Sequence, residues 1–180
     1  PWSVLGSMAG ATYAAGWAEP WPGSLALFSS ETEEGYLPVD RTQRPSTVAR
    51  LIEPLPASRP FLWSRDAGVE VEVLSGAFAS ASKEAVLNGA NLAALASPNG
   101  GWELLRFQRA ELVAERRYRL SRMLRGFGGT EPLIGAPPPS GSVLVLLDEA
   151  LLRFELDADQ IGLERNYRLG PGTLDLSDPS

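Results

Sequence analysis

The chain has 180 residues and a formal net charge of −6, and it contains neither histidine nor cysteine. Without these two residue types it cannot form Ser-His-Asp or Cys-His nucleophilic sites, metal centres with histidine or cysteine ligands, or disulfide bonds. The acidic balance disfavours nucleic acid as a partner, because binding to phosphates needs a basic face that displaces counterions.

Residues 1–23 are rich in alanine, glycine, tryptophan and proline, and we interpret them as a linker or arm from a preceding domain. Trp2, Trp17 and Trp21 would each expose a large apolar ring in a solvated linker, so we expect them to pack partly on this chain or on a neighbour. The chain begins with proline and has no basic segment ahead of an apolar one. We therefore expect no signal peptide and a piece of a longer protein.

Three strands are predicted before the first proline cluster, at residues 24–30, 36–41 and 47–53. Pro38 has no backbone N–H to donate, so the second of these strands should lie at a sheet edge. Further prolines, at positions 54, 56 and 60, rule out a continuous helix or a central strand. A sub-domain boundary is therefore predicted near residues 54–67.

The clearest alternation lies in residues 68–74. Val69, Val71 and Val73 share one face, and two glutamates share the other, which predicts a strand with one buried face. Paired carboxylates raise the hypothesis of acid/base catalysis. However, side chains two positions apart on a strand are ~6.5–7 Å apart and no apolar residues enclose them, so we prefer a solvated face.

A short helix or a turn is predicted over residues 82–89, with Ser82 as the candidate N-cap. Residues 91–97 fit either a helical turn or a strand. Residues 102–108 alternate as a strand, and residues 111–114 continue this strand or pair with it.

Residues 118–131 run from a strand into a glycine-rich corner. Gly126, Gly128 and Gly129 permit backbone angles that are closed to other residues. We expect a tight corner, or a place where another chain's backbone comes close. The corner lacks the lysine and the following helix of a phosphate-binding loop, so no nucleotide site is predicted.

Five arginines lie within ten positions of this region, at 116, 117, 119, 122 and 125. Guanidinium groups suit an interface or a patch that contacts anions or sugars. The alternative, which we favour, is that they pair with glutamates of neighbouring strands or of a neighbouring subunit. The candidate interaction surface comprises Arg117, Arg119, Arg122, Arg125, Gly126, Phe127, Gly128 and Gly129.

Further strands are predicted at residues 141–148, 153–156 and 164–169, and residues 173–180 are predicted to be a frayed tail. Two short acidic clusters, Asp148-Glu149 and Asp157 with Asp159, offer oxygen ligands of the kind that Ca²⁺ prefers. Neither has the spacing of an EF-hand loop. We interpret both as solvated turns and predict no metal site.

The composition favours many turns and short strands, with 15 prolines and 18 glycines. We predict a mainly β fold with a few short helices (α+β), whose antiparallel sheets form a β-sandwich or a barrel-like structure over residues 24–172. The hydrophobic fraction of 44% is typical of globular proteins. No apolar run approaches the ~20 residues of a membrane-spanning helix.

Two stretches, residues 102–113 and 118–131, resemble the C-terminal region of large multidomain phage-tail hub or tip proteins, including the baseplate protein of gene transfer agents. The matching residues are Leu105, Phe107, Ala110, Glu111, Leu112, Val113, Tyr118, Leu120, Ser121, Leu124, Arg125, Gly126, Gly129, Thr130 and Glu131. Shorter matches at residues 74–77, 88–91 and 146–150 extend the resemblance over roughly residues 24–171. Met123 departs from the usual leucine at similar volume, and Phe127-Gly128 stand where the family often has charged residues.

This resemblance implies a structural module of a virion tail, encoded by a phage, a prophage or a gene transfer agent and assembled in the bacterial cytoplasm. It implies other tail or baseplate subunits as partners, a homotrimer in the assembled tail and a role in host attachment. Some relatives carry a glycosidase-like domain, but upstream of the matched residues. No enzymatic activity, catalytic residue, cofactor, metal or nucleic-acid partner is therefore predicted for this chain.

Two other hypotheses stay open at this point. A carbohydrate-binding module for host cell-surface glycans would stack sugar faces on its tryptophans, with Trp17, Trp21, Trp63 and Trp102 as candidates. A carboxylate-only glycosidase would use Glu70, Glu72, Asp148 and Glu149.

Overall fold

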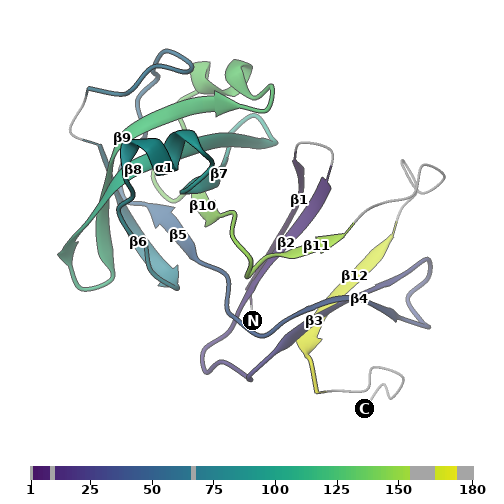
Figure 1. The fold of residues 1–180 in the computed structure, drawn as a ribbon. Helices are drawn as coiled ribbons and strands as arrows, with labels where there is room; N and C mark the ends of the chain where they lie inside the picture. The colour runs from purple at the N-terminus through teal and green to yellow at the C-terminus, as the bar shows by residue number, and fades with distance from the viewer. Residues whose placement is uncertain (1, 9–10, 66–67, 155–164, 174–180) are drawn as a thin grey trace. The chain divides into compact units, whose positions relative to one another are not determined.

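The computed structural model describes residues 2–8, 11–65, 68–154 and 165–173. They form a mainly β structure of antiparallel sheets, which confirms the predicted fold class (Figure 1). The chain divides into two compact units. Thr47–Asp148 form the barrel unit, and the segments before and after it, Pro1–Ser46 and Glu149–Ser180, together form the flanking unit.

These limits differ from the single domain over residues 24–172 that the sequence suggests. The prolines suggest a sub-domain boundary near residues 54–67 in the sequence, yet this stretch lies within the barrel unit. Leu55, between two of those prolines, is only 2% exposed and belongs to the barrel core. Proline excludes regular ladder pairing but not burial, which explains why the stretch resembles a boundary.

The flanking unit holds two three-stranded sheets, ordered β1-β2-β11 and β12-β3-β4. Their strands are β1 (Trp2–Met8), β2 (Ala11–Trp17), β3 (Leu25–Ser30), β4 (Leu37–Thr42), β11 (Leu152–Phe154) and β12 (Asn166–Pro171). Ala14 and Leu152 from one sheet pack with Leu27 from the other in a small core. As predicted from Pro38, β4 lies at a sheet edge.

The segment suggested as a linker or arm contains the strands β1 and β2. Their alanine and glycine residues have low strand propensity. As the central strand of its sheet, β2 pairs with β1 on one side and with β11 on the other, where Ala14 lies opposite Leu152. Trp17 is buried and Trp21 half-buried, so both rings pack on this chain. The side chain of Trp2 lies outside what the structure describes.

The barrel unit is a closed six-stranded antiparallel barrel, ordered β10-β5-β6-β9-β8-β7. Its strands are β5 (Val48–Leu51), β6 (Val69–Ser75), β7 (Leu92–Ala96), β8 (Trp102–Ala114), β9 (Arg117–Phe127) and β10 (Val143–Leu146), with the helix α1 (Lys83–Leu87) and the 3-10 helix η1 (Glu131–Gly135) outside the ladder. Closure removes the unpaired sheet edges on which other chains can add strands.

Several local predictions are confirmed in this unit. The valines of β6 are buried, and the Ser82 side chain caps α1 by accepting a hydrogen bond from the Ala85 N–H at 3.1 Å. Of the segment 91–97, for which a helical turn or a strand is expected, residues 92–96 form the strand β7, and residues 111–114 continue β8. The sequence is therefore most informative where one face is apolar or where a cap is present.

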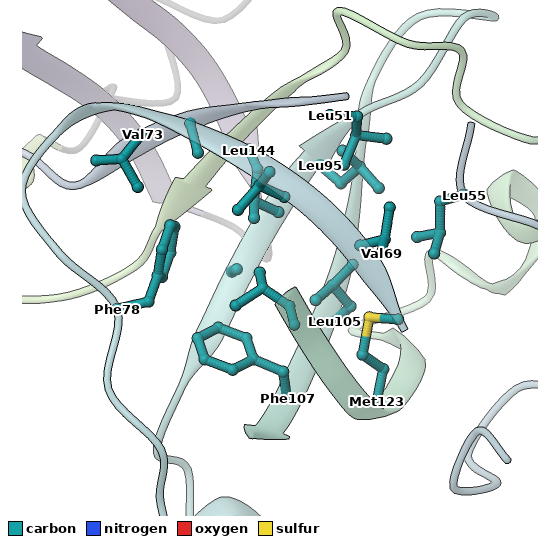
Figure 2. Packing of buried hydrophobic residues seen from close by; sticks show 14 residues of the cluster. Leu51, Leu55, Val69, Val73, Phe78, Leu95, Leu105, Phe107, Met123 and Leu144 are labelled. Carbon is teal, nitrogen blue, oxygen red and sulfur yellow. The ribbon is translucent and has the colours of Figure 1, made fainter. Parts of the chain in front are cut away.

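The barrel core is filled by side chains from every strand (Figure 2). Phe107 of β8 is fully buried, and its ring meets Phe78 edge to face with 5.7 Å between the ring centroids. Phe78 makes a similar edge contact with Tyr118 of β9 at 5.8 Å. Edge-to-face geometry is the arrangement that aromatic quadrupoles favour, so these rings fix the barrel interior.

Gly68, just before β6, has a φ of +92°, and a Cβ there would lie 2.2 Å from the Leu120 carbonyl oxygen. We expect Gly68→Ala to lower the free energy of unfolding by about 2–4 kcal/mol, because left-handed backbone strain adds to a clash with main chain. Gly129 has a φ of +81°, and a Cβ added there would meet no atom within 4 Å, so Gly129→Ala carries the strain alone, about 1 kcal/mol. Urea unfolding compares the free energies of unfolding of the two variants. Equal losses of stability would contradict the clash with the Leu120 carbonyl oxygen.

Candidate functional site

Strand β9 changes the direction in which its side chains point at Arg122. Leu120 and Met123 both lie in the barrel core, although they are three positions apart and strict alternation would separate them. Arg122 has a φ of +53°, in the left-handed region that few residues other than glycine adopt. This conformation keeps Arg122 exposed while Met123 returns to the interior.

The arginines on the outer face of β9 differ in their contacts. Arg117 is exposed, and Arg119 pairs with Glu70 of β6, with 2.5 Å between Nη2 and Oε1. The two residues are direct cross-strand partners in the β6–β9 ladder. Arg116 donates to the carbonyl oxygens of Val73 and Leu74. The favoured alternative, pairing with glutamates of neighbouring strands, is confirmed for Arg119 with Glu70 of β6 and for Arg125 with Glu103 of β8.

Arg125 corrects the predicted surface, because it lies inside the barrel. Its side chain and that of Glu103 on β8 are each 1% exposed. The guanidinium donates two hydrogen bonds of 2.6 Å to the carboxylate, from Nε to Oε1 and from Nη2 to Oε2. Its third nitrogen donates to the Pro56 carbonyl oxygen. A cation with every partner inside the fold is not available to a ligand.

The glycine corner after β9 is closed by the chain's own 3-10 helix. Gly126 is buried with a φ of +81°, and a Cβ there would lie 3.0 Å from Ile134 of η1. Phe127 is half-buried between the Phe61 ring and the Arg106 guanidinium. Gly128 and Gly129 are exposed. The corner thus stabilises the barrel end, and only its tip remains accessible.

Residues 58–65, from the proline-rich stretch, form a loop. This loop runs along the part of β9 that follows the residues paired with β6. Phe61 N–H donates to the Arg125 carbonyl oxygen at 3.1 Å, and Ser64 N–H donates to the Met123 carbonyl oxygen at 2.9 Å. The Ser64 hydroxyl in turn accepts from the Met123 N–H at 2.9 Å. These bonds hold residues 58–65 beside the outer face of the β8–β9 hairpin.

A cleft of about 1140 Å³ lies between this loop and the hairpin. Its described lining includes Leu62, Trp63, Glu111, three serines and the arginines Arg59, Arg65, Arg109, Arg119 and Arg122. On the hairpin, Arg109 lies opposite Ser121 and Glu111 opposite Arg119, so these four side chains share one face. The cleft brings together arginines from two distant parts of the sequence.

Of the predicted surface, only Arg119 and Arg122 line this cleft. Arg59, Trp63, Arg65 and Arg109 were missed as members of it, because no spacing in the sequence relates the proline-rich loop to β8. The signal that was present is compositional: the loop carries two arginines and a tryptophan, residues enriched where proteins bind partners.

The family model described as "Rcc01698-like, C-terminal" matches residues 46–145. This range covers more than half of the chain and coincides closely with the barrel unit, Thr47–Asp148. The chain belongs to the Rcc01698-like, C-terminal family. A comparison with curated proteins finds no match.

Of the carboxylates considered for a glycosidase, Glu70, Glu72 and Asp148 lie in this Rcc01698-like barrel unit and Glu149 lies in the flanking unit. Glu70 is held by Arg119, and Glu72 is exposed opposite Arg117. Asp148 and Glu149 are both exposed. Within the described ranges, no three acidic side chains gather as a metal-binding group. The acidic cluster at residues 157 and 159 lies outside the described residues.

The tryptophans proposed for glycan stacking divide between the two units, with Trp17 and Trp21 in the flanking unit and Trp63 and Trp102 in the barrel unit. Trp17 is buried in the flanking unit, whereas Trp63 lines the cleft of the barrel unit. Trp21 and Trp102 are half-buried.

Each helix in the described part of the Rcc01698-like chain has five residues, whereas crossing a membrane takes about 20.

Proposed function

We propose that the chain is a structural module of a phage or phage-like tail hub or tip protein, which holds neighbouring tail or baseplate subunits in place and takes part in host attachment. The family match carries this proposal, since it covers the barrel unit and agrees with the resemblance of residues 102–113 and 118–131 to tail hub proteins. The setting is the virion tail of a phage, a prophage or a gene transfer agent.

The positions of the resembling residues support a mechanical role. Phe107 and Leu120 lie in the barrel core, Arg125 forms the buried ion pair, and Gly126 forms the closed corner. These residues maintain the shape of the barrel. A rigid body that presents fixed surfaces suits assembly.

The tip of the β8–β9 hairpin offers a surface for such assembly. Leu112 is 65% exposed and Val113 is 41% exposed. Neighbouring apolar side chains on a projecting hairpin are favourable contacts for another subunit, because burial removes them from water. In a homotrimer the same tip would be presented three times around one axis.

The test uses the full-length protein in cells that release the particles. Deleting residues 47–148 is expected to give particles with incomplete tails that no longer transfer DNA, measured by electron microscopy and by transduction. The control variant Gly129→Ala keeps the barrel and should assemble normally. Intact, infectious particles without residues 47–148, or absence of the protein from purified tails, would contradict the proposal.

A further inference from the structure

The cleft between residues 58–65 and the β8–β9 hairpin concentrates positive charge on an acidic chain. The chain has 16 basic residues and a net charge of −6. Five of those basic residues line the cleft, and Glu111 is the one carboxylate among its described lining residues. Such a local excess attracts anions even where the net charge of the protein would repel them.

Two arginines of the cleft, Arg109 and Arg119, already have acidic partners but keep further N–H donors. Arg109 and Glu111 lie 3.8 Å apart, and both side chains are more than half exposed. Arg119 contacts Glu70 through one of its nitrogens, while its side chain is 43% exposed. The exposed Arg109–Glu111 pair contributes little stability, and each guanidinium has five N–H donors, so both arginines keep donors for a further anion.

The remaining three arginines, Arg59, Arg65 and Arg122, are exposed. Arg122 is exposed because of its left-handed backbone, an arrangement that costs about 1–2 kcal/mol in a residue with a side chain. The same conformation returns Met123 to the core. The strand therefore satisfies its packing and at the same time directs a cation outward beside the loop.

The chemistry of the lining selects the ligand class. Guanidinium groups donate hydrogen bonds and accept none, so they match carboxylates and other groups that only accept. A neutral sugar needs both donors and acceptors, and Glu111 is the one charged acceptor in the described lining. Anionic groups are therefore the favoured occupants.

Apolar side chains beside the arginines favour a polypeptide over a bare polyanion. Leu62 is 57% exposed, and Trp63 is half-buried in the same lining. Combined aromatic, apolar and arginine contacts are typical of protein interfaces. A volume of about 1140 Å³ exceeds the ~300–1,000 Å³ of most small-ligand sites and suits an extended segment.

From this lining we infer that the cleft binds an acidic, leucine-bearing polypeptide segment of a partner protein, with carboxylates on Arg59, Arg119 and Arg122 and an apolar side chain on Leu62. The inference deepens the proposed assembly function, because it gives the chemistry of one partner. Its own support is the geometry of the cleft, which belongs entirely to the barrel unit.

The test measures fluorescence anisotropy of a short labelled peptide of glutamates and leucines mixed with the 180-residue chain. We expect binding at low salt that weakens as the Debye length falls from ~10 Å at 0.1 M to ~3 Å at 1 M. A peptide with glutamine in place of every glutamate should bind at least about tenfold more weakly, or ~1.4 kcal/mol.

The variant Arg59→Gln/Arg122→Gln should lose at least about tenfold in affinity for the acidic peptide. The control Arg50→Gln/Arg117→Gln makes the same change in net charge at exposed arginines outside the cleft lining, and it should bind like the unmodified chain. Leu62→Gln should weaken binding of the peptide of glutamates and leucines more than binding of a peptide of glutamates alone. Thermal unfolding of each variant confirms that the barrel is intact.

Equal losses in the two arginine variants would overturn the inference, as would the absence of peptide binding. Sulfated oligosaccharide and single-stranded DNA serve as competing probes, and selective binding of either one through Arg59 and Arg122 would also overturn it. If the peptide fails to bind while the full-length protein is still required for tails, this inference fails and the proposed function stands. If the peptide binds but residues 47–148 are dispensable for tails, the proposed function fails alone.

Discussion

Replacing Glu103 with glutamine is expected to lower the free energy of unfolding of the barrel unit by about 3–5 kcal/mol. Glu103 and Arg125 are each 1% exposed and share two hydrogen bonds of 2.6 Å. Glutamine keeps the size of the side chain but removes its charge. The Arg125 guanidinium then stays buried without a counter-charge, which costs far more than the loss of an exposed pair.

Hydrogen exchange at the amides of β6 measures this change, because these amides report on the barrel unit alone in a chain with two compact units. The double variant Glu103→Leu/Arg125→Met is the matched control. It removes both charges and should be clearly more stable than Glu103→Gln, although the Pro56 carbonyl oxygen also loses a donor. A loss below about 1 kcal/mol for Glu103→Gln would show that water reaches the pair.

Truncating Phe107 to alanine is expected to cost about 3–5 kcal/mol of barrel stability. The Phe107 ring is fully buried and meets the edge of Phe78, so alanine would leave a cavity and remove an aromatic contact. The surrounding side chains come from every strand of a closed barrel and have little freedom to collapse into the space.

The control is Leu112→Ala on the same strand, β8, where the side chain is 65% exposed. This substitution should change stability by no more than about 0.5 kcal/mol. Hydrogen exchange at the β6 amides, measured at increasing urea concentration, compares the stability of the barrel unit in the two variants. Similar effects for Phe107→Ala and Leu112→Ala would mean that the barrel core is not packed as described.

The fold class was predictable because apolar alternation is a local property. Val69, Val71 and Val73 predict a buried strand face, and Pro38 predicts an edge strand; both are confirmed. The strand pair at residues 2–17 was not predictable in the same way. Its alanines carry a weak strand signal, and β11, which pairs with the second edge of β2, lies near residue 152, far along the chain.

The position of Arg125 was missed although the sequence contained a usable signal. With a period of two, Glu103 shares a face with Leu105 and Phe107, and Arg125 shares one with Met123. A carboxylate and a cation that both fall on inward faces predict a buried pair, since either alone would be very costly. The glycines after Arg125 drew attention to the surface instead.

The cleft lay beyond what the sequence could predict. Its two walls are joined by backbone hydrogen bonds between residues 61–64 and residues 123–125. Such contacts depend on how the loop closes over β9, and loop closure follows no periodic pattern. Alternation alone would have placed the Arg122 side chain in the core. It is exposed because its backbone is left-handed.

The order of the two units along the chain has a consequence during synthesis. The strand pairs β1–β2 and β3–β4 emerge from the ribosome before the barrel unit, whereas the third strand of each sheet, β11 or β12, emerges after it. At roughly 5–20 residues per second, translation of the intervening barrel keeps the early strands waiting for about 5–20 seconds. The barrel therefore has time to fold first, while β2 and β3 present incomplete edges that attract chaperones or neighbouring nascent chains.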